Sequence, residues 1–128
     1  MRLLLDTHAL LWWFDGDKRL SQTGRDLVTD PENEIVVSAA SAWEIATKAR
    51  LGKLPKALAV ARNLPRAIAG QGFVPLAMTV AHAERAGWLP GRHRDPFDRM
   101  LAAQALAEDL TLLTVDAVFA NFGVRTLW

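Results

Sequence analysis

Four carboxylates of the 128-residue sequence occupy positions from which they could act together: Asp6, Glu44, Asp98 and Asp116. Asp6 and Asp116 each directly follow a short apolar run, and the other two lie within the first two turns of predicted helices. In a parallel sheet, the carboxyl ends of the strands and the starts of the helices that follow them share one edge. We therefore expect all four side chains along that edge.

The surroundings of Glu44 favour a chemical role over a surface position. Its neighbours in residues 39–46 are mostly apolar, which predicts a partly buried carboxylate that needs a partner. Converging carboxylates raise each other's pKa values unless a cation neutralises them. Oxygen ligands without cysteine or a paired-histidine motif suit Mg²⁺ or Mn²⁺, and such an ion can activate water for phosphodiester hydrolysis. The residues therefore indicate a metal-dependent nuclease.

Short apolar runs alternate with stretches of helical periodicity along the chain. The predicted strands are 3–5, 35–38, 73–76, 112–115 and 124–127. The predicted helices are 20–29, 40–51, 57–69, 79–87 and 97–110. This alternation predicts βαβ units, with strands buried on both faces. We expect one domain over residues 1–128, a three-layer α/β/α sandwich around a mainly parallel sheet of four to five strands.

Composition excludes several classes of protein. Hydrophobic residues make up 51% and charged residues 23%, as in globular chains, and the net charge of +1 gives no bulk attraction to nucleic acid or membrane. Without cysteine there are no disulfides and no thiolate zinc sites. No uncharged apolar stretch approaches the ~20 residues of a membrane span. We expect a soluble, cytoplasmic protein with no membrane partner.

Each acid also has a purely structural interpretation. Asp6, Asp95 and Asp116 could each cap the helix that follows, because aspartate accepts hydrogen bonds from the first free N–H groups of a helix. Glu44 could pair with Lys48 one turn later, a contact worth about 0.3–0.5 kcal/mol. Asp98 could stabilise the start of its helix by interacting with the positive end of the helix dipole. A metal site and helix caps are therefore alternatives for these positions.

Four blocks, in this order, resemble the PIN-domain ribonucleases and specifically the VapC toxins of bacterial toxin–antitoxin pairs. The blocks are residues 1–11, 38–45, 93–105 and 112–116. The third is the most specific, because its acid is followed by three residues and then a pair of alanines. Together the blocks extend over nearly the whole chain.

The resemblance implies a role for each matched residue. It places catalytic, metal-binding acids at Asp6, Glu44, Asp98 and Asp116, and supporting hydroxyls at Thr7 and Thr114. Asp95 either caps the helix, which we favour, or orients Asp98 or a metal-bound water. The family implies a Mg²⁺- or Mn²⁺-dependent endoribonuclease that cuts RNA at one or a few sites. It also implies a VapB-like antitoxin as partner, bound across the active-site groove of a homodimer.

Basic side chains cluster near two of the acids. Lys48, Arg50, Lys53 and Lys56 follow Glu44, and Arg92, His93, Arg94 and Arg99 surround Asp98. They are either solvated helix ends or contacts to RNA phosphates. The RNA-binding candidates are Lys48, Arg50, Arg92, Arg94 and Arg99. No histidine is assigned a catalytic role.

Aromatic residues give a less specific signal. No stacking platform of the RNA-recognition type stands out in the sequence. Trp12, Trp13 and Phe14 cannot all face one core from a single helix. One side of that helix is therefore exposed or covered by a partner, unless the chain itself buries most of its circumference.

Other functions fit the residues less well. A magnesium-binding receiver module needs a central phospho-acceptor aspartate and a late lysine, but the corresponding strands end in Ser38 and Asp116. An aspartate-nucleophile phosphatase needs a second aspartate where His8 stands. A PIN nuclease that processes RNA without being a toxin is the remaining alternative.

Overall fold

A five-stranded parallel sheet forms the centre of the computed structural model, which describes residues 1–54 and 58–128. The strands lie in the order β3-β2-β1-β4-β5, and each pairs in parallel with its neighbour. Their bounds are β1 Arg2–Leu5, β2 Glu34–Ser38, β3 Val74–Leu76, β4 Thr111–Leu113 and β5 Thr126–Leu127. The predicted parallel sheet is confirmed.

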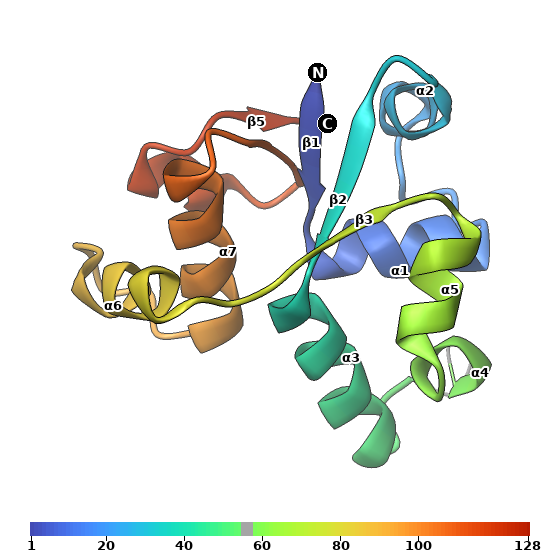
Figure 1. Ribbon diagram of the computed structural model, residues 1–128, viewed down its shortest axis with the longest axis horizontal. Helices are drawn as coiled ribbons and strands as arrows, with labels where there is room; N and C mark the ends of the chain where they lie inside the picture. Colours follow the sequence, from blue (N-terminus) through green and yellow to red (C-terminus); the bar gives the residue numbers. More distant parts are fainter. Residues whose placement is uncertain (55–57) are drawn as a thin grey trace.

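Helices cover both faces of the sheet, as predicted for a three-layer sandwich (Figure 1). Helices α1, α2, α4 and α5 lie on one side, and α6, α7 and the 3₁₀ helix η1 lie on the other. The bounds are α1 Thr7–Asp15, α2 Gln22–Thr29, α3 Ala39–Arg50, α4 Leu58–Ala61, α5 Leu64–Gly70, α6 Val80–Trp88, α7 Pro96–Ala107 and η1 Ala117–Phe122. Among the described residues, no helix is long and apolar enough to cross a membrane.

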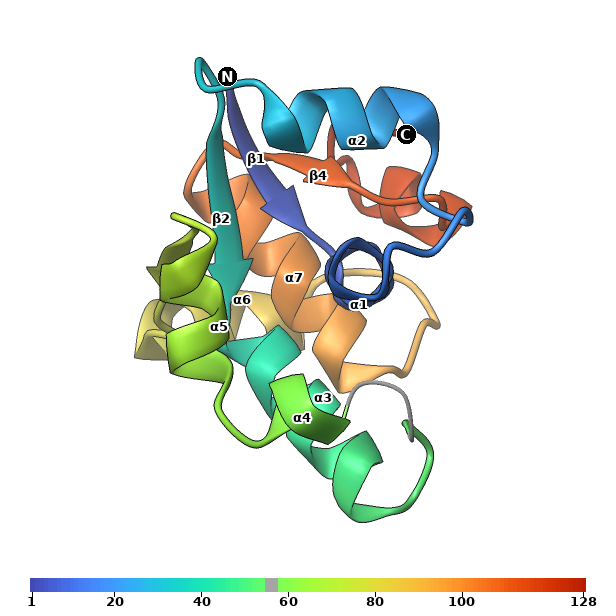
Figure 2. The ribbon, with the colours of Figure 1, turned by 90° about the vertical axis from the view of Figure 1, so that its right-hand side faces the viewer.

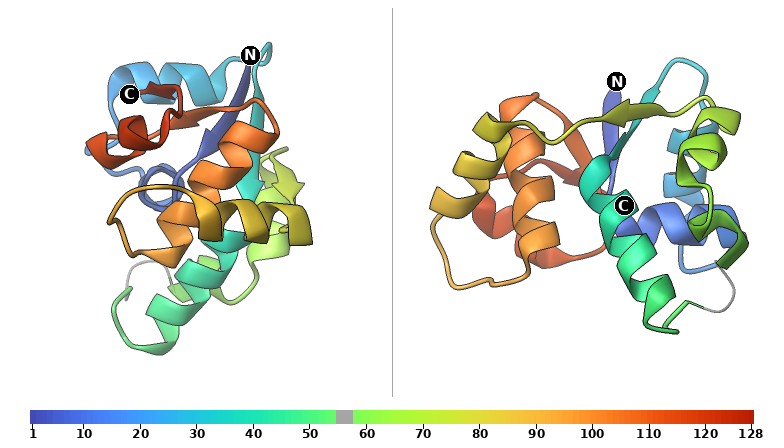
Figure 3. Two further views of the ribbon diagram at one scale, coloured as in Figure 1. Left: turned by 90° about the vertical axis from the view of Figure 1, so that its left-hand side faces the viewer. Right: turned by 60° about the horizontal axis from the view of Figure 1, so that its bottom comes forward.

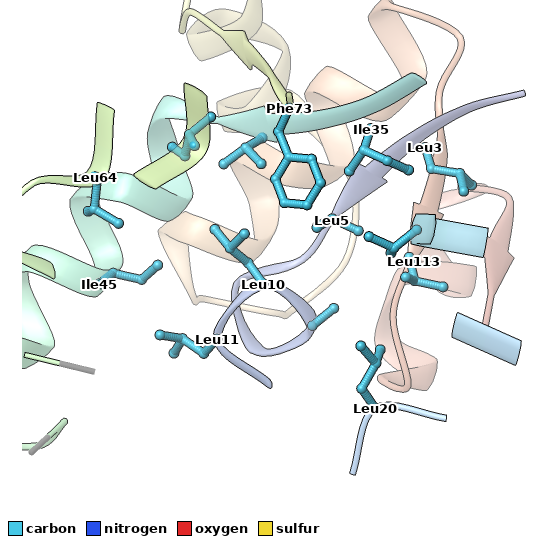
Figure 4. Close-up of a cluster of buried hydrophobic side chains, with 14 residues drawn as sticks. Leu3, Leu5, Leu10, Leu11, Leu20, Ile35, Ile45, Leu64, Phe73 and Leu113 are labelled. Atoms are coloured by element: carbon cyan, nitrogen blue, oxygen red, sulfur yellow. The ribbon is translucent and has the colours of Figure 1, made fainter. Parts of the chain in front are cut away.

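The alternation of side chains along β1 divides the core into two clusters. Leu3 and Leu5 point into a cluster with Leu10 of α1 and Phe73, which lies before β3 (Figure 4). Leu4 points to the opposite face and packs with residues of α7, β4 and η1. All three leucines of β1 are fully buried. This central strand therefore fixes the position of the residue that follows it, Asp6.

The carboxyl ends of the two central strands lead directly into helices. β1 is followed by α1, and β2 is followed without a break by α3 (Figure 2). Helix α7 lies on the same side of the sheet as α6 and contacts α3. The starts of α1, α3 and α7 therefore lie near the same edge of the sheet (Figures 2 and 3). This edge is where the sequence predicts the acids.

The prediction of one continuous helix over residues 57–69 was wrong. The stretch predicted as helix 57–69 contains two helices, because α4 ends at Ala61 and α5 begins at Leu64. Asn63 caps α5 by accepting a hydrogen bond from the Arg66 N–H, and the following Pro65 suits a first turn. The predicted start at residue 57 lies outside the described residues.

Two other predicted elements end earlier than expected, and two strands are less buried than expected. The strand predicted as 112–115 ends at Leu113, and Val115 is exposed, so Asp116 does not follow the strand directly. The prediction that every strand is buried on both faces was wrong for β3 and β5, which form the edges of the sheet. The helix predicted to end at residue 110 ends at Ala107.

The aromatic residues of α1 are covered by other parts of this chain. Trp12, Trp13 and Phe14 are all partly buried and pack against the first core cluster. Trp12 also contacts the rings of His8 and Trp128. The chain itself therefore surrounds much of this helix, which is one of the two alternatives that the sequence left open.

Candidate active site

Asp6 is buried at the point where β1 becomes α1. Its Oδ1 accepts the Ala9 N–H at 2.7 Å, so it caps α1. Its Oδ2 accepts the hydroxyl of Thr114 at 2.5 Å, from the segment that follows β4. The two oxygens thus have different partners, and Asp6 caps its helix while remaining at the edge of the sheet.

The protein disfavours the charged form of Asp6. Burial raises the pKa of this carboxyl above its ordinary value, and the hydrogen bonds from Thr114 and Ala9 offset the rise in part. The charge of His8 lowers the pKa of Asp6, whereas the negative charge of Asp98 raises it. Asp6 and Asp98 are therefore close enough to repel each other.

Glu44 lies on the buried side of α3, as the apolar surroundings predicted. Only 5% of the residue is exposed. Its Oε2 lies 2.7 Å from Nζ of Lys48, one turn further along the helix, and a third of the Lys48 side chain is exposed. The predicted pair therefore forms, but around a buried carboxylate whose charge Lys48 neutralises.

Asp98 lies in the first turn of α7, where Asp95 caps the helix. Asp95 Oδ1 accepts the N–H groups of Phe97 at 2.9 Å and of Asp98 at 3.2 Å. Asp98 itself is half-buried, and its Oδ2 lies 2.8 Å from Nε2 of His93. Asp95 thus has the capping position that the sequence favoured for it.

The pKa of Asp98 is also raised. Burial is the main cause, and the negative charges of Asp95 and Glu44 add to the rise. The hydrogen bond with His93 and its charge lower the pKa of Asp98 in part. The charge of Asp98 acts on Asp6 and the charge of Glu44 acts on Asp98, which places these three carboxylates in one region.

Asp116 differs from the other three acids because it is exposed. Its side chain caps η1 by accepting the Val118 N–H at 3.0 Å. Its own N–H donates to the Thr114 hydroxyl at 3.0 Å, and that hydroxyl donates to Asp6. Thr114 thus connects Asp116 with Asp6, although the Asp116 carboxylate faces solvent.

Two buried hydroxyls join α1 to α3 beneath the acids. The Thr7 hydroxyl donates to Oγ of Ser41 at 3.1 Å, and both residues are buried. Ser41 precedes Glu44 by one helical turn, on the same face of α3. Sequence reasoning assigned no role to Ser41, and it named His93 only among the basic residues around Asp98. The helical spacing from Glu44 could have revealed Ser41, but His93 lies in a loop where no periodicity links it to Asp98.

The donor set suits a hard divalent cation. Asp6, Glu44 and Asp98 offer only oxygen atoms, and burial, with a smaller contribution from neighbouring negative charges, raises the pKa values of Asp6 and Asp98, which a bound cation would offset. Within residues 1–54 and 58–128, however, no three Asp, Glu, His or Cys side chains lie close enough together to hold a metal ion. Glu44 and Asp98 instead turn to Lys48 and His93. Metal binding therefore requires these two carboxylates to turn towards Asp6.

The basic residues predicted to contact RNA are placed in different ways. Arg50, Arg92 and Arg94 are exposed, and Lys48 pairs with Glu44. The guanidinium of Arg99 donates to backbone carbonyls at the end of α6 and in the loop after it, those of Ala86, Gly87, Leu89 and His93. Arg99 therefore holds α7 to that segment. Lys56 lies outside the described residues.

Residues 3–124 match the family described as the PIN domain. The chain belongs to the PIN domain family. This membership removes the receiver-like and phosphatase alternatives and confirms the family that the four sequence blocks indicated. The match covers the described strands from β1 to β4 and all the acids discussed above.

Among curated proteins, the chain is similar to Ribonuclease VapC16 of Mycobacterium tuberculosis (strain ATCC 25618 / H37Rv), with 47% identity over 58 residues. The aligned part is 45% of this chain and 41% of that protein, so it spans less than half the length of this relative.

Solved structures share the fold over almost the whole chain. VapBC2 from Rickettsia felis, bound to a DNA fragment from its promoter, has a TM-score of 0.73 and 17% identity, covering 99% of this chain and 98% of that chain. Mycobacterium tuberculosis VapC20, described as a sarcin-ricin loop cleaving toxin, has a TM-score of 0.58 and 17% identity, covering 95% of each chain. At 17% sequence identity, these structures show that the fold is shared and do not by themselves show a shared activity.

Proposed function

We propose that this protein is a VapC-type toxin, an endoribonuclease that depends on Mg²⁺ or Mn²⁺ and hydrolyses RNA phosphodiester bonds at the acidic edge of its sheet. The observation that carries the proposal is the gathering of buried Asp6, buried Glu44 and half-buried Asp98 at one edge of the sheet, where burial raises the pKa values of Asp6 and Asp98 and the charge of Asp98 adds to the rise at Asp6. A fold does not by itself favour such crowding of carboxylates, but a site for a divalent cation does. The PIN domain match gives the site its context.

Different residues would bind the ion, position its ligands and contact the phosphate. Asp6, Glu44 and Asp98 would hold the ion, with Asp116 as a fourth, exposed acid. When bound, the ion supplies a Lewis acid and an activated water for attack on phosphorus. Thr114 fixes one oxygen of Asp6 at the edge of the sheet. The side chains of Lys48 and His93 are each about one-third exposed and could contact phosphate once the carboxylates release them.

The relatives support the substrate and the partner. Ribonuclease VapC16 and the sarcin-ricin loop cleaving VapC20 favour RNA as the substrate. The VapBC2 structure favours a small antitoxin as the partner. We infer that a VapB-like antitoxin silences this protein and that the protein forms a homodimer in the cytoplasm. A PIN nuclease of RNA processing predicts no such partner and no arrest of growth when it is expressed alone.

Cleavage of total bacterial RNA by the purified protein tests the proposal. We expect discrete fragments with Mg²⁺ or Mn²⁺ and none with chelator. The Asp6→Asn variant should lose cleavage, whereas Asp109→Asn should keep it. Asp109 is a matched control because its side chain is 91% exposed and pairs with Arg125 away from the site. Folded wild-type protein that cuts no RNA with either metal would contradict the proposal.

A further inference from the structure

An exposed tryptophan stands beside two of the candidate acids. Trp43 directly precedes Glu44 in α3, and Phe97 directly precedes Asp98 in α7. The two rings meet edge to face, with centroids 4.8 Å apart and an interplanar angle of 76°. This contact bridges the two helices that carry the acids. Trp43 nevertheless remains 56% exposed, so much of its surface is free to bind something else.

Both rings border a small cavity between α3, α6 and α7. Its volume is about 250 Å³. Besides Trp43 and Phe97, its lining includes the small residues Ala83 and Gly87 of α6 and the flexible side chain of Met100. Aromatic and methionine side chains offer flat, polarizable contacts, and small residues leave room between them. The size and chemistry suit one planar ring system.

We propose that Trp43, held by Phe97, stacks on a nucleobase of single-stranded RNA next to the phosphate that the acids engage. This proposal rests on the proposed ribonuclease function and adds a base-binding subsite to it. Bases of single-stranded RNA stack on exposed aromatic side chains, and each such contact is worth about 1–3 kcal/mol. Because every base has a flat face, stacking alone needs no particular sequence.

The position of Trp43 favours RNA over a second copy of the chain as the occupant. Trp43 and Phe97 each precede one of the candidate acids by one residue, so their side chains leave the helices about 100° around from the carboxylates, and the aromatic pair would receive the base of a nucleotide next to a phosphate at the acids. Lys48 of α3 and His93 of the loop before α7 are about one-third exposed and pair with Glu44 and Asp98, and they would become available to the RNA backbone once these acids engage a cation. The proposal therefore places the base-binding aromatic pair on the same two helices as Glu44 and Asp98.

Binding of two probes by the full chain in Mn²⁺, with phosphorothioate linkages that resist hydrolysis, separates stacking from charge. The first probe is a short single-stranded oligoadenylate, and the second is an abasic ribose-phosphate oligomer of the same length. Wild-type protein should bind oligoadenylate more tightly. Trp43→Ala should weaken binding of oligoadenylate by about 5- to 150-fold and leave binding of the abasic oligomer unchanged. Trp43→Phe should restore part of the loss.

Trp88→Ala is the matched control, because Trp88 is 84% exposed and does not line this cavity. It should bind both probes as the wild type does. Equal losses for both probes, no loss with Trp43→Ala, or no binding of oligoadenylate by the wild type would overturn the proposal. So would a change of oligomeric state in Trp43→Ala during sedimentation, because a second copy would then cover the pair. If wild-type protein still cuts RNA in Mg²⁺ in these cases, only the stacking proposal fails.

Discussion

Replacement of Thr114 by valine removes the hydroxyl that holds Asp6 and leaves the shape of the side chain almost unchanged. The hydroxyl donates to Asp6 Oδ2 at 2.5 Å and accepts the Asp116 N–H at 3.0 Å. A hydrogen bond to a charged group contributes about 1.5–3 kcal/mol. The Asp116 N–H lies at the exposed side, where water can replace its partner. We therefore expect Thr114→Val to lower the free energy of unfolding by about 2 kcal/mol at neutral pH.

This loss corresponds to a measurable fall in melting temperature. An unfolding entropy of about 2.1 cal/mol/K per residue gives about 0.27 kcal/mol/K for 128 residues. A loss of about 2 kcal/mol therefore lowers the melting temperature by about 7 °C. Thr114→Ser is the control, because it keeps the hydroxyl and loses only a methyl group, worth about 0.8 kcal/mol.

The effect should also depend on pH. The pKa of Asp6 in the folded protein lies above its ordinary value of 3.8, so the stability tied to this group is full below 3.8 and falls as pH rises through the folded pKa. The Thr114 bond lowers the folded pKa, so its removal raises that pKa further and deepens the loss at higher pH. Thermal melts in chelator should show a larger difference between Thr114→Val and wild type at neutral than at acid pH. A difference that is the same at every pH, or that Thr114→Ser reproduces in full, would refute the role of Thr114.

Three further predictions follow from single contacts. Gln104→Leu should lower the free energy of unfolding, measured with urea, by about 3 kcal/mol, because it leaves the Ser38 hydroxyl and the Ala77 carbonyl without their buried partner. A decrease of less than about 1 kcal/mol would contradict this. Asp95→Ala should cost about 1 kcal/mol in the same measurement, because α7 loses its cap, and Asp95→Asn should restore most of it. Asp98→Asn should raise the melting temperature in chelator, because it removes a charge that burial disfavours. Addition of Mn²⁺ should then raise the melting temperature of the wild type but not that of the variant. A lower melting temperature of the variant in chelator would contradict an unfavourable charge at Asp98.

The sequence predicted the parts of the site that depend on local patterns. The leucines of β1 place Asp6, and the apolar surroundings of Glu44 indicated its burial. The Asp95–Pro96 pair indicated the start of α7. These features depend on strand alternation, helix caps and helical spacing, all of which involve neighbours in the chain. They position three of the four acids near one edge of the sheet.

Features that depend on contacts between distant segments were not predicted. The contact between Trp43 and Phe97 depends on how α3 packs against α7, and the pair of His93 with Asp98 depends on the path of a loop. Apolar spacing continues across Asn63 and outweighed the local signal of a helix start, an asparagine cap followed by Pro65 in the first turn. Val115 was included in a strand because it is apolar, yet it is exposed in the loop that leads to Asp116. Hydrophobicity alone does not mark the end of β4.

Calorimetric titration of the metal-free protein with Mn²⁺ tests the central claim most directly, because it measures the acidic site without RNA or antitoxin. Wild-type protein and Asp109→Asn should bind Mn²⁺ with the same affinity. Asp6→Asn and Asp98→Asn should each weaken binding at least about tenfold, because each removes a charged oxygen ligand. Equal affinity in all four proteins, or no saturable binding by folded wild-type protein, would contradict a shared metal site at these carboxylates.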